Sequence, residues 1–274
     1  MPELPEVETI VRELREAGLI GLIIDKALVF WGRSIAIPEF KLFCEQIIKQ
    51  KILDIQRRGK FLVFSLTQDT LLVHLRMTGK FIMHVKEILP HSHERVRLYL
   101  NDGRILAYED QRKFGKWYLV PSPNKMFEKI GLEPLSPNFT SAAFKNVLKN
   151  RNTRIKPFLL DQRFVAGLGN IYVDEALWQA KIHPLRSVKS LTAKEIKSLH
   201  EAIILVLEHG VENTGTSLGS ARANYFSVSG RRGTNQQRLN VFRRDGLPCY
   251  RCQSTIQKMV LAQRGTHFCA KCQI

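Results

Sequence analysis

The sequence predicts an α+β chain with three successive regions: an N-terminal helix with a β-sandwich, a helical region, and a C-terminal zinc-finger β-hairpin. Three observations support this fold class. Many short β-like runs separated by turns follow the first helix, which is typical of a β-sandwich. Apolar residues then recur at helical spacing. Four of the five cysteines form two closely spaced pairs near the C-terminus.

A helix is expected close to the start of the chain, because apolar residues recur there at i, i+3, i+4 and i+7. These residues are Val7, Ile10, Val11 and Leu14. Pro5 suits the first helical position, and the carboxylates of Glu6 and Glu8 suit the positive end of the helix dipole.

Runs with β-like composition follow this helix, and each is expected to form a strand. They are Ala27–Trp31, Lys51–Gln56, Lys60–Leu66, Leu71–Arg76, Lys80–Val85, Val96–Leu100, Arg104–Tyr108 and Lys116–Val120. Residues 101–103, Asn-Asp-Gly, are a hairpin turn signal. Cys44 lies in an apolar, helix-like stretch, and we expect it to be buried and without a chemical role. A proline-bearing connector, residues 131–137, ends the region.

Helical spacing dominates the region that follows. Ala142–Lys149 and Ile155–Leu160 are short helix candidates, and residues 196–207 carry a longer stripe that we expect to end at Gly210. Between them, Asn170 follows two glycines and is expected to cap a helix. Free amides at a helix start bind phosphate readily, although a glycine-asparagine cap is more often ordinary structure.

The two cysteine pairs have the spacing of a four-cysteine zinc site. Their members are Cys249, Cys252, Cys269 and Cys272. Four thiolates complete a tetrahedral shell and leave no position for water, so we expect one structural Zn²⁺ per chain. The residues between the pairs have the pattern of a strand, a tight turn over residues 262–265 and a return strand. This pattern places Arg264 at the tip of a β-hairpin.

The charge balance indicates nucleic acid as a partner. Lys and Arg total 42 against 25 Asp and Glu, a formal net charge of +17. This excess favours a polyanion; a basic protein that is merely soluble, or that touches acidic membranes, is the weaker interpretation. We therefore expect Arg264 to contact a DNA phosphate or groove. No apolar run reaches the ~20 residues of a membrane span and the start of the chain is acidic, so we expect a cytoplasmic protein without a membrane partner.

The opening Met1-Pro2-Glu3 has the makings of a nucleophile. Removal of Met1 would turn Pro2 into a terminal secondary amine, which titrates near ~8 rather than near the ~10.4 of a lysine. Such an amine can attack C1′ of a sugar, and the resulting iminium ion has no second proton to lose. Glu3 stands beside it and could move protons. On these residues alone, an ordinary helix start remains the alternative.

Six motifs, in order, give the chain a resemblance to bacterial formamidopyrimidine-DNA glycosylases (8-oxoguanine DNA glycosylases), of the formamidopyrimidine-DNA glycosylase and endonuclease VIII family. They are Pro2–Thr9, Arg57–Lys60, His74–Met77, Asp110–Gly115, Gly167–Tyr172 and the four-cysteine hairpin with Arg264. The resemblance covers essentially the whole length. It implies a catalytic β-sandwich domain over 1–133, a helix-two-turns-helix DNA-binding domain over 134–240 and a zinc finger over 241–274.

The resemblance implies a base-excision repair enzyme for damaged double-stranded DNA, with DNA glycosylase and abasic-site lyase activities. Such an enzyme flips an oxidised purine out of the duplex. It then excises the base through a Schiff base at Pro2 and cuts the strand by β,δ-elimination. Glu3 would protonate the sugar ring oxygen, Glu6 would support the N-terminus, and Lys60 would contact phosphate near the lesion. Lys60 is also a surface cation in the simpler interpretation, and a weaker rival nucleophile.

By the same resemblance, Met77, Arg112 and Phe114 would fill the space left by the flipped base. The sequence alone favours a core position for Met77 and Phe114. The other DNA-binding candidates would hold phosphates around the lesion or, for one of them, the lesion itself. They are His74, Arg76, Lys156, Asn170 and Arg264, of which Lys156 is the candidate for the lesion or the backbone.

Two segments depart from the family pattern. Residues 242–244, Phe-Arg-Arg, stand where related enzymes usually carry a Tyr followed by Gly-Arg, so a phenolic hydroxyl is absent and a cation is added. Residues 214–237 match the position of the loop that covers the everted base, but their composition is atypical. Their arginines, Arg222, Arg231 and Arg232, are candidates for backbone binding instead.

Two alternatives stay open. An endonuclease VIII-type enzyme for oxidised pyrimidines would share the proline-glutamate start and the zinc hairpin, but Arg112 and Phe114 favour the purine enzyme. A non-catalytic lesion-binding protein would use the same scaffold, but the intact set of Pro2, Glu3, Glu6 and Lys60 argues against it. We expect the protein to act as a monomer.

Overall fold

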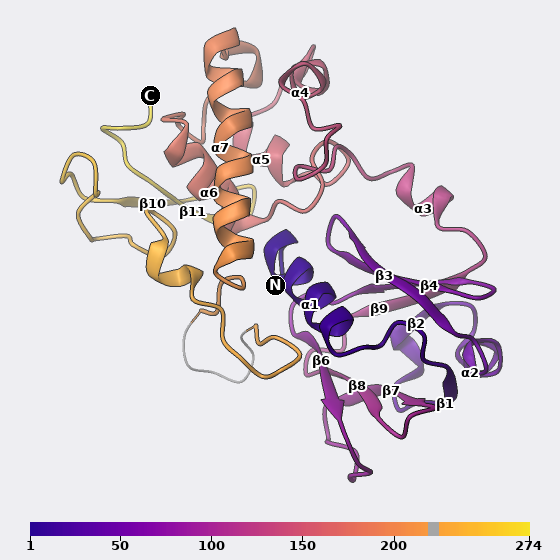
Figure 1. Cartoon of the computed structure of the whole chain (residues 1–274). Helices are drawn as coiled ribbons and strands as arrows, with labels where there is room; N and C mark the ends of the chain where they lie inside the picture. Colours follow the sequence, from indigo (N-terminus) through magenta and orange to yellow (C-terminus); the bar gives the residue numbers. More distant parts are fainter. Residues whose placement is uncertain (219–224) are drawn as a thin grey trace. The chain divides into compact units, whose positions relative to one another are not determined.

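The computed structural model describes residues 1–218 and 225–274, which form two compact units. The first unit comprises residues 1–127 and 213–234, and the second comprises residues 128–212 and 235–274 (Figure 1). In the described residues, no helix has the combination of length and apolar character that a bilayer crossing requires.

The first unit begins with helix α1, Leu4–Glu16. Its predicted apolar stripe is confirmed, because Val7, Ile10, Val11 and Leu14 are all buried in the core of the unit. Pro5 lies in the first turn, as expected from its fixed φ and missing N–H. One face of α1 thus anchors the start of the chain.

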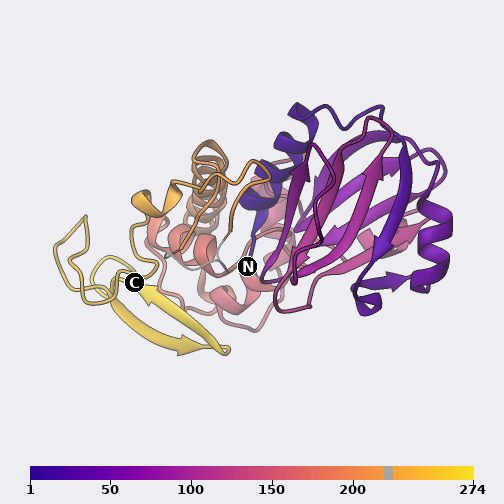
Figure 2. The same ribbon diagram turned by 90° about the horizontal axis from the view of Figure 1, so that it is seen from below.

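Two sheets follow and form the predicted β-sandwich (Figures 1 and 2). The four-stranded sheet has the order β1 (Ile24–Val29), β7 (Glu94–Leu100), β8 (Ile105–Asp110), β6 (Gly79–His84). The five-stranded sheet has the order β2 (Ile35–Ile37), β9 (Lys116–Val120), β5 (Thr70–His74), β4 (Phe61–Leu66), β3 (Ile52–Arg58). The β2–β9 pair is parallel and the other pairs are antiparallel.

Each predicted β-run overlaps an observed strand, and the turn at 101–103 joins β7 to β8. The short strand β2 was not expected, because three residues give too little alternation to recognise. Helix α2, Phe40–Ile47, turns only Phe43 and Ile47 fully inward. Cys44 is half-buried, so the expectation that it is buried is wrong: it lies on the flank of a helix with a narrow apolar face.

The second unit is helical, with α4 (Ser141–Leu148), α5 (Ile155–Leu160), α6 (Asn170–Gln179) and α7 (Ala193–Glu212). Helix α7 continues past Gly210, so the expected end there is wrong. Residues 171–178 of α6 are all buried, which identifies α6 as the central helix of this unit. The shorter elements of the chain are the helix α3 (Asn124–Phe127) and the 3₁₀ turns η1 (Gly32–Ser34), η2 (Val188–Ser190) and η3 (Asn235–Arg238).

The zinc-finger hairpin consists of β10, Gln257–Leu261, and β11, Arg264–Phe268. Its two-residue turn is Ala262-Gln263, with φ values of 49° and 59°, as a type I′ turn requires. Arg264 pairs with Leu261 and therefore begins the return strand directly after the tip.

Residues 213–218 and 225–234 pack with the first unit through carboxylates of α1. The Thr216 N–H donates to Glu6 Oε1 at 2.7 Å, and Ser229 N and Arg231 Nη2 donate to the Glu13 carboxylate at 3.0 and 3.2 Å. The predicted domain boundaries placed these residues in the helical region. The three-domain division stays a prediction, and the compact units are the two given above.

Candidate active site

The start of α1 brings Pro2, Glu3 and Glu6 together. Pro2 is buried, while Met1 is 48% exposed. Glu3 is the N-cap of α1, and its N–H donates to Glu6 Oε2 at 2.7 Å. The other Glu6 oxygen accepts from Thr216, so this buried carboxylate holds the backbone on both sides. Backbone N–H groups are the partners that a buried carboxylate needs.

Gly215 makes room for this arrangement. Its φ of +83° is unfavourable for other residues, and a Cβ at this position would lie 2.8 Å from Glu6 Cγ. A side chain at residue 215 would therefore displace the Glu6 carboxylate.

Lys60 lies in the turn between β3 and β4, after Gly59 with a φ of 57°. Its side chain is buried, with 7% exposure for the residue. Sequence reasoning missed an ion pair, between Arg57 and Glu8, that joins this turn to α1. Arg57 Nε donates to Glu8 Oε2 at 2.8 Å, and Arg57 Nη1 donates to the Gly59 carbonyl at 3.2 Å. The sequence shows the Arg57–Lys60 motif, but it does not show that Glu8 is the partner of Arg57.

His74 ends β5 and is neutral at physiological pH. Burial and the nearby cations Arg76 and Lys60 lower the pKa of His74 to about 3. Its Nδ1 accepts from the Arg76 N–H at 3.0 Å, and its ring lies edge-on to Phe61 at 4.8 Å between centroids. His74 therefore carries no charge and has one ring N–H as a hydrogen-bond donor.

The structure brings Met77, Arg112 and Phe114 together from two turns. Arg112 Nη1 lies 2.8 Å from Met77 Sδ, and Arg112 Cζ lies 4.7 Å from the Phe114 ring centroid. Met77 is 40% exposed and Phe114 is 49% exposed. Neither is a core residue, which is the placement that the family resemblance favoured over the sequence alone. The guanidinium is held between a sulfur and an aromatic face.

In the second unit, Asn170 and Lys156 converge on the hairpin. Asn170 Nδ2 donates to the Gly265 carbonyl at 2.8 Å, and Lys156 Nζ donates to the same oxygen at 3.1 Å. The N-cap of α6 is Gly169, so the expected capping role of Asn170 is wrong: its amide is committed to the hairpin. Gly265 adjoins Arg264, and two helices thus fix the backbone beside that arginine.

Lys156 is fully buried and forms an ion pair with Asp174 at 2.6 Å. The other Asp174 oxygen accepts from the His267 N–H at 2.9 Å and lies 3.3 Å from His267 Nδ1. This placement does not support the predicted contact between Lys156 and DNA, because the ammonium group is buried and binds Asp174 and the Gly265 carbonyl. Asp174 and His267 were missed by sequence reasoning, since only the fold brings them to Lys156.

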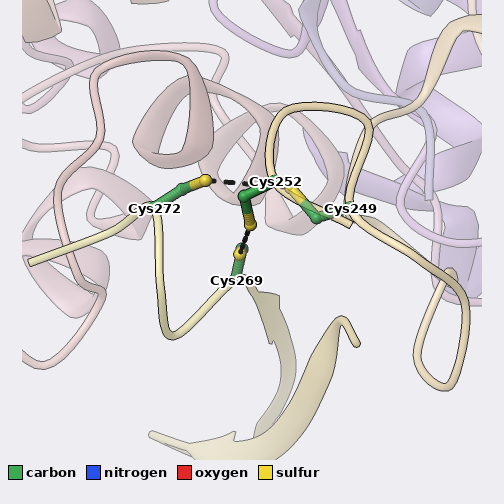
Figure 3. Close-up of side chains that lie close together, drawn as sticks. All are labelled: Cys249, Cys252, Cys269 and Cys272. Atoms are coloured by element: carbon green, nitrogen blue, oxygen red, sulfur yellow. Dashed lines mark hydrogen bonds between the residues drawn. The ribbon is translucent and has the colours of Figure 1, made fainter. Parts of the chain in front are cut away.

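The four cysteines fit one structural zinc ion. Their Sγ atoms all lie within 4.8 Å of one another, with 3.9 Å between Cys249 and Cys272 and 3.5 Å between Cys252 and Cys269. Tetrahedral Zn–S bonds of ~2.3 Å place sulfurs ~3.8 Å apart, whereas a disulfide would need ~2.05 Å. The side chains come from the segment before β10 and the segment after β11 and point toward one another (Figure 3).

Phe242, which departs from the family pattern, occupies a buried position. The ring is buried and packs edge-on against His267 at 5.0 Å, and the Phe242 N–H donates to Glu175 Oε1 at 2.9 Å. Asn240 and Val241 also donate to the Glu175 carboxylate, while burial raises the pKa of Glu175. A phenylalanine here supports the base of the zinc finger.

Two of the three arginines in 214–237, Arg231 and Arg232, lie in the described residues. Arg231 donates to Glu13, and the Arg232 guanidinium lies 6.0 Å from the Phe226 ring centroid. Arg222 lies outside the described residues.

Three family models match the chain. The formamidopyrimidine-DNA glycosylase N-terminal domain matches residues 1–117, its H2TH domain matches residues 130–221, and the zinc finger found in FPG and IleRS matches residues 246–274. The formamidopyrimidine-DNA glycosylases of Protochlamydia amoebophila and Enterococcus faecalis are similar, at 45% and 47% identity. Both alignments cover 100% of this chain, and 99% and 97% of those proteins.

Solved structures of Lactococcus lactis Fpg are also similar. A complex with abasic-site DNA has a TM-score of 0.90 and a complex with Fapy-dG-containing DNA has a TM-score of 0.89. Each is 38% identical and covers 99% of both chains. The chain belongs to the formamidopyrimidine-DNA glycosylase family.

Proposed function

We propose that this protein removes oxidised purines, namely 8-oxoguanine and formamidopyrimidines, from double-stranded DNA and then cleaves the strand. Family membership makes it a DNA glycosylase and lyase of base-excision repair. The observation that carries the finer proposal is the placement of Pro2 beside Glu3 at a helix start whose backbone Glu6 fixes. Because such a substrate is chromosomal, we also propose that the protein acts in the cytoplasm, on the nucleoid.

In the proposed reaction, removal of Met1 exposes the secondary amine of Pro2. Its lone pair attacks C1′ of the flipped nucleotide, the bond to the base breaks, and the base leaves with the bonding electrons. The ammonium formed at Pro2 gives up its N–H proton, which balances the proton that the departing base takes up. Glu3 protonates the sugar ring oxygen, which opens the ring and leaves an iminium ion at C1′. A rigid N-terminus serves this step, since attack depends on the orientation of the amine.

Strand cleavage follows from the iminium ion. It acidifies C2′–H, and loss of that proton expels the 3′ phosphate in β-elimination. A second elimination, with loss of the C4′ proton, expels the 5′ phosphate, and addition of water to the conjugated iminium ion releases the sugar remnant as an aldehyde and returns the amine of Pro2. Glu3 is the carboxylate next to this centre, so we assign it the proton transfers.

The neighbouring residues have proposed roles in DNA binding. Met77 and Phe114 replace the flipped base in the stack, and Arg112 offers hydrogen-bond donors to the orphaned cytosine. Lys60, His74 and Arg264 are proposed to contact phosphates near the lesion, as charges or as hydrogen-bond donors. Asn170 is proposed to do so through the second N–H of its amide, because the Gly265 carbonyl takes only one. The zinc site stabilises the hairpin that presents Arg264.

Borohydride trapping tests the substrate class. Borohydride reduces an iminium ion to a stable amine, so enzyme and DNA become covalently linked. We expect trapping on a duplex with 8-oxoguanine opposite cytosine, little on a thymine glycol duplex, and none on undamaged DNA. Stronger trapping on the oxidised pyrimidine would support an endonuclease VIII-type enzyme instead. Tight lesion binding without trapping, in protein shown by mass to lack Met1, would support a non-catalytic protein.

A further inference from the structure

Asp110 is a buried carboxylate at the point where two site-bearing turns meet. It ends β8, has 0% exposure, and lies opposite Gly79 at the start of β6. The turn before Gly79 carries Met77, and the turn after Asp110 carries Arg112 and Phe114.

Both oxygens of the Asp110 carboxylate are engaged with these turns. Oδ1 accepts from Thr78 Oγ1 and from the Arg112 N–H, the latter at 3.2 Å. Oδ2 accepts from the Gly115 N–H at 2.7 Å. Thr78 Oγ1 in addition accepts from the Arg112 N–H at 3.1 Å. Thr78 follows Met77 directly, so a single hydroxyl links the Met77 turn to the backbone of Arg112.

The backbone of both turns needs such support. Arg76 and Lys113 have φ values of 54° and 61°, in the left-handed region that costs a non-glycine residue of order 1–2 kcal/mol. The main chain of Asp110 adds further restraint. Its carbonyl accepts from the Lys113 N–H at 3.3 Å and from Arg95 Nε at 2.9 Å, and its N–H donates to the His93 carbonyl at 2.9 Å.

Gly115 and Gly79 both lie close to the Tyr108 hydroxyl. A Cβ at Gly115 would lie 1.7 Å from Tyr108 Oη and 3.2 Å from Asp110 Oδ2, and a Cβ at Gly79 would lie 2.4 Å from the same hydroxyl. Both glycines therefore lie against the Tyr108 hydroxyl with no room for a side chain, and a larger residue at either position would displace the backbone beside Asp110.

We infer that Asp110 and Thr78 are positioning residues that hold Met77, Arg112 and Phe114 in one preassembled group before DNA binds. This inference rests on the proposed function, in which those three side chains enter the gap left by the flipped base. Preassembly matters because the side chains then lose less freedom on insertion, and because small misplacements near a reacting centre are costly.

The test compares Thr78→Val and Asp110→Asn with Thr78→Ser. Valine keeps the shape of threonine without its hydroxyl, asparagine turns one acceptor into a donor, and serine restores the hydroxyl. Asp102→Asn serves as the control, because the Asp102 carboxylate accepts hydrogen bonds from Arg104 at the opposite end of β8. Single-turnover excision of 8-oxoguanine is compared with cleavage of a preformed abasic site, which has no base to evict.

We expect Thr78→Val and Asp110→Asn to slow excision by about tenfold to a hundredfold and abasic-site cleavage by less than about threefold. Thr78→Ser and Asp102→Asn should match the unaltered protein in both reactions. An equal loss in both reactions would contradict the inference, as would normal excision by Thr78→Val. The valine variant keeps the test decisive if Asp110→Asn fails to fold.

A catalysis-independent readout separates this inference from the proposed function. A duplex with a tetrahydrofuran abasic analogue and 2-aminopurine next to it reports, by fluorescence, whether side chains fill the gap. We expect the change that the unaltered protein produces to shrink with Thr78→Val and to return with Thr78→Ser. If the unaltered protein fails to excise 8-oxoguanine but shows this pattern, the proposed function falls and the positioning role stands. An unaltered signal with Thr78→Val would overturn the positioning role.

Discussion

The carboxylates on the first turn of α1 have different tasks. Glu6 spends both oxygens on backbone N–H groups, those of Glu3 and Thr216, and so acts as a support. Glu3 directly follows Pro2 and is assigned the proton transfers. The Glu3 side chain also accepts from the Glu6 N–H in the capping box, and both residues are buried, so the division rests on the adjacency of Glu3 to Pro2.

Glu3→Gln should retain DNA binding and lose base excision. The amide keeps the size of the carboxylate but cannot exchange a proton, and a general acid or base typically contributes ~10²–10⁴ in rate. The measurement is single-turnover excision of 8-oxoguanine together with equilibrium binding to abasic-analogue DNA. Glu16→Gln is the control, since Glu16 is an exposed residue at the end of the same helix. Excision at the unaltered rate by Glu3→Gln would refute the assignment.

At the scale of elements, the hairpin is held by the helices as well as by its zinc site. Lys156 from α5 and Asn170 from α6 both donate to the Gly265 carbonyl, and Asp174 from α6 holds Lys156 and His267. The Gly265 carbonyl, which accepts both hydrogen bonds, belongs to the residue after Arg264. We therefore treat Lys156 as a residue that positions the hairpin.

Lys156→Met should destabilise the protein by about 3–5 kcal/mol, because Asp174 would remain buried without its cation. Urea unfolding of the zinc-loaded protein measures this change. Lys197→Met is the control: Lys197 is 71% exposed and 4.0 Å from Glu201, so its loss should cost less than about 1 kcal/mol.

DNA binding discriminates further between the two roles of Lys156. A positioning role predicts weaker binding with an unchanged dependence on salt. Loss of a direct phosphate contact would instead reduce the slope of log K against log salt by about 0.9. That smaller slope, with unchanged stability, would restore Lys156 as a phosphate ligand.

The elements themselves could largely be predicted from the sequence, because periodicity and turn residues are local signals. Helix α5 and strand β9 match their predicted ranges, and the four cysteines identify their own partners by spacing. What the sequence lacked were contacts between distant residues. Glu6 with Thr216 and Lys156 with Asp174 join segments that only the fold brings together.

Two expectations were wrong because tertiary packing outweighed a local signal. A glycine near a helix end usually marks a stop, but Gly210 lies inside α7 because one glycine costs only ~1 kcal/mol in a long packed helix. Asn170 has the residue type of a cap, yet its side chain is committed to a carbonyl 95 residues away. Local propensity does not reveal such a partner.

At the scale of the whole molecule, the formal net charge of +17 predicts binding that depends strongly on salt. If the protein neutralises about five phosphates, log K against log salt should have a slope near roughly −4.5. Affinity measured between low and moderate salt on an abasic-analogue duplex tests this. An affinity that does not change with salt would rule out phosphate contacts as the main source of affinity.

We propose that the terminal amine of Pro2 is the nucleophile, and peptide mapping of the borohydride-trapped complex identifies the attacking residue. We expect the DNA remnant on residue 2 of protein that has lost Met1, and we expect Lys60→Met to trap as well. An adduct on Lys60, or efficient trapping by protein that retains Met1, would contradict the account.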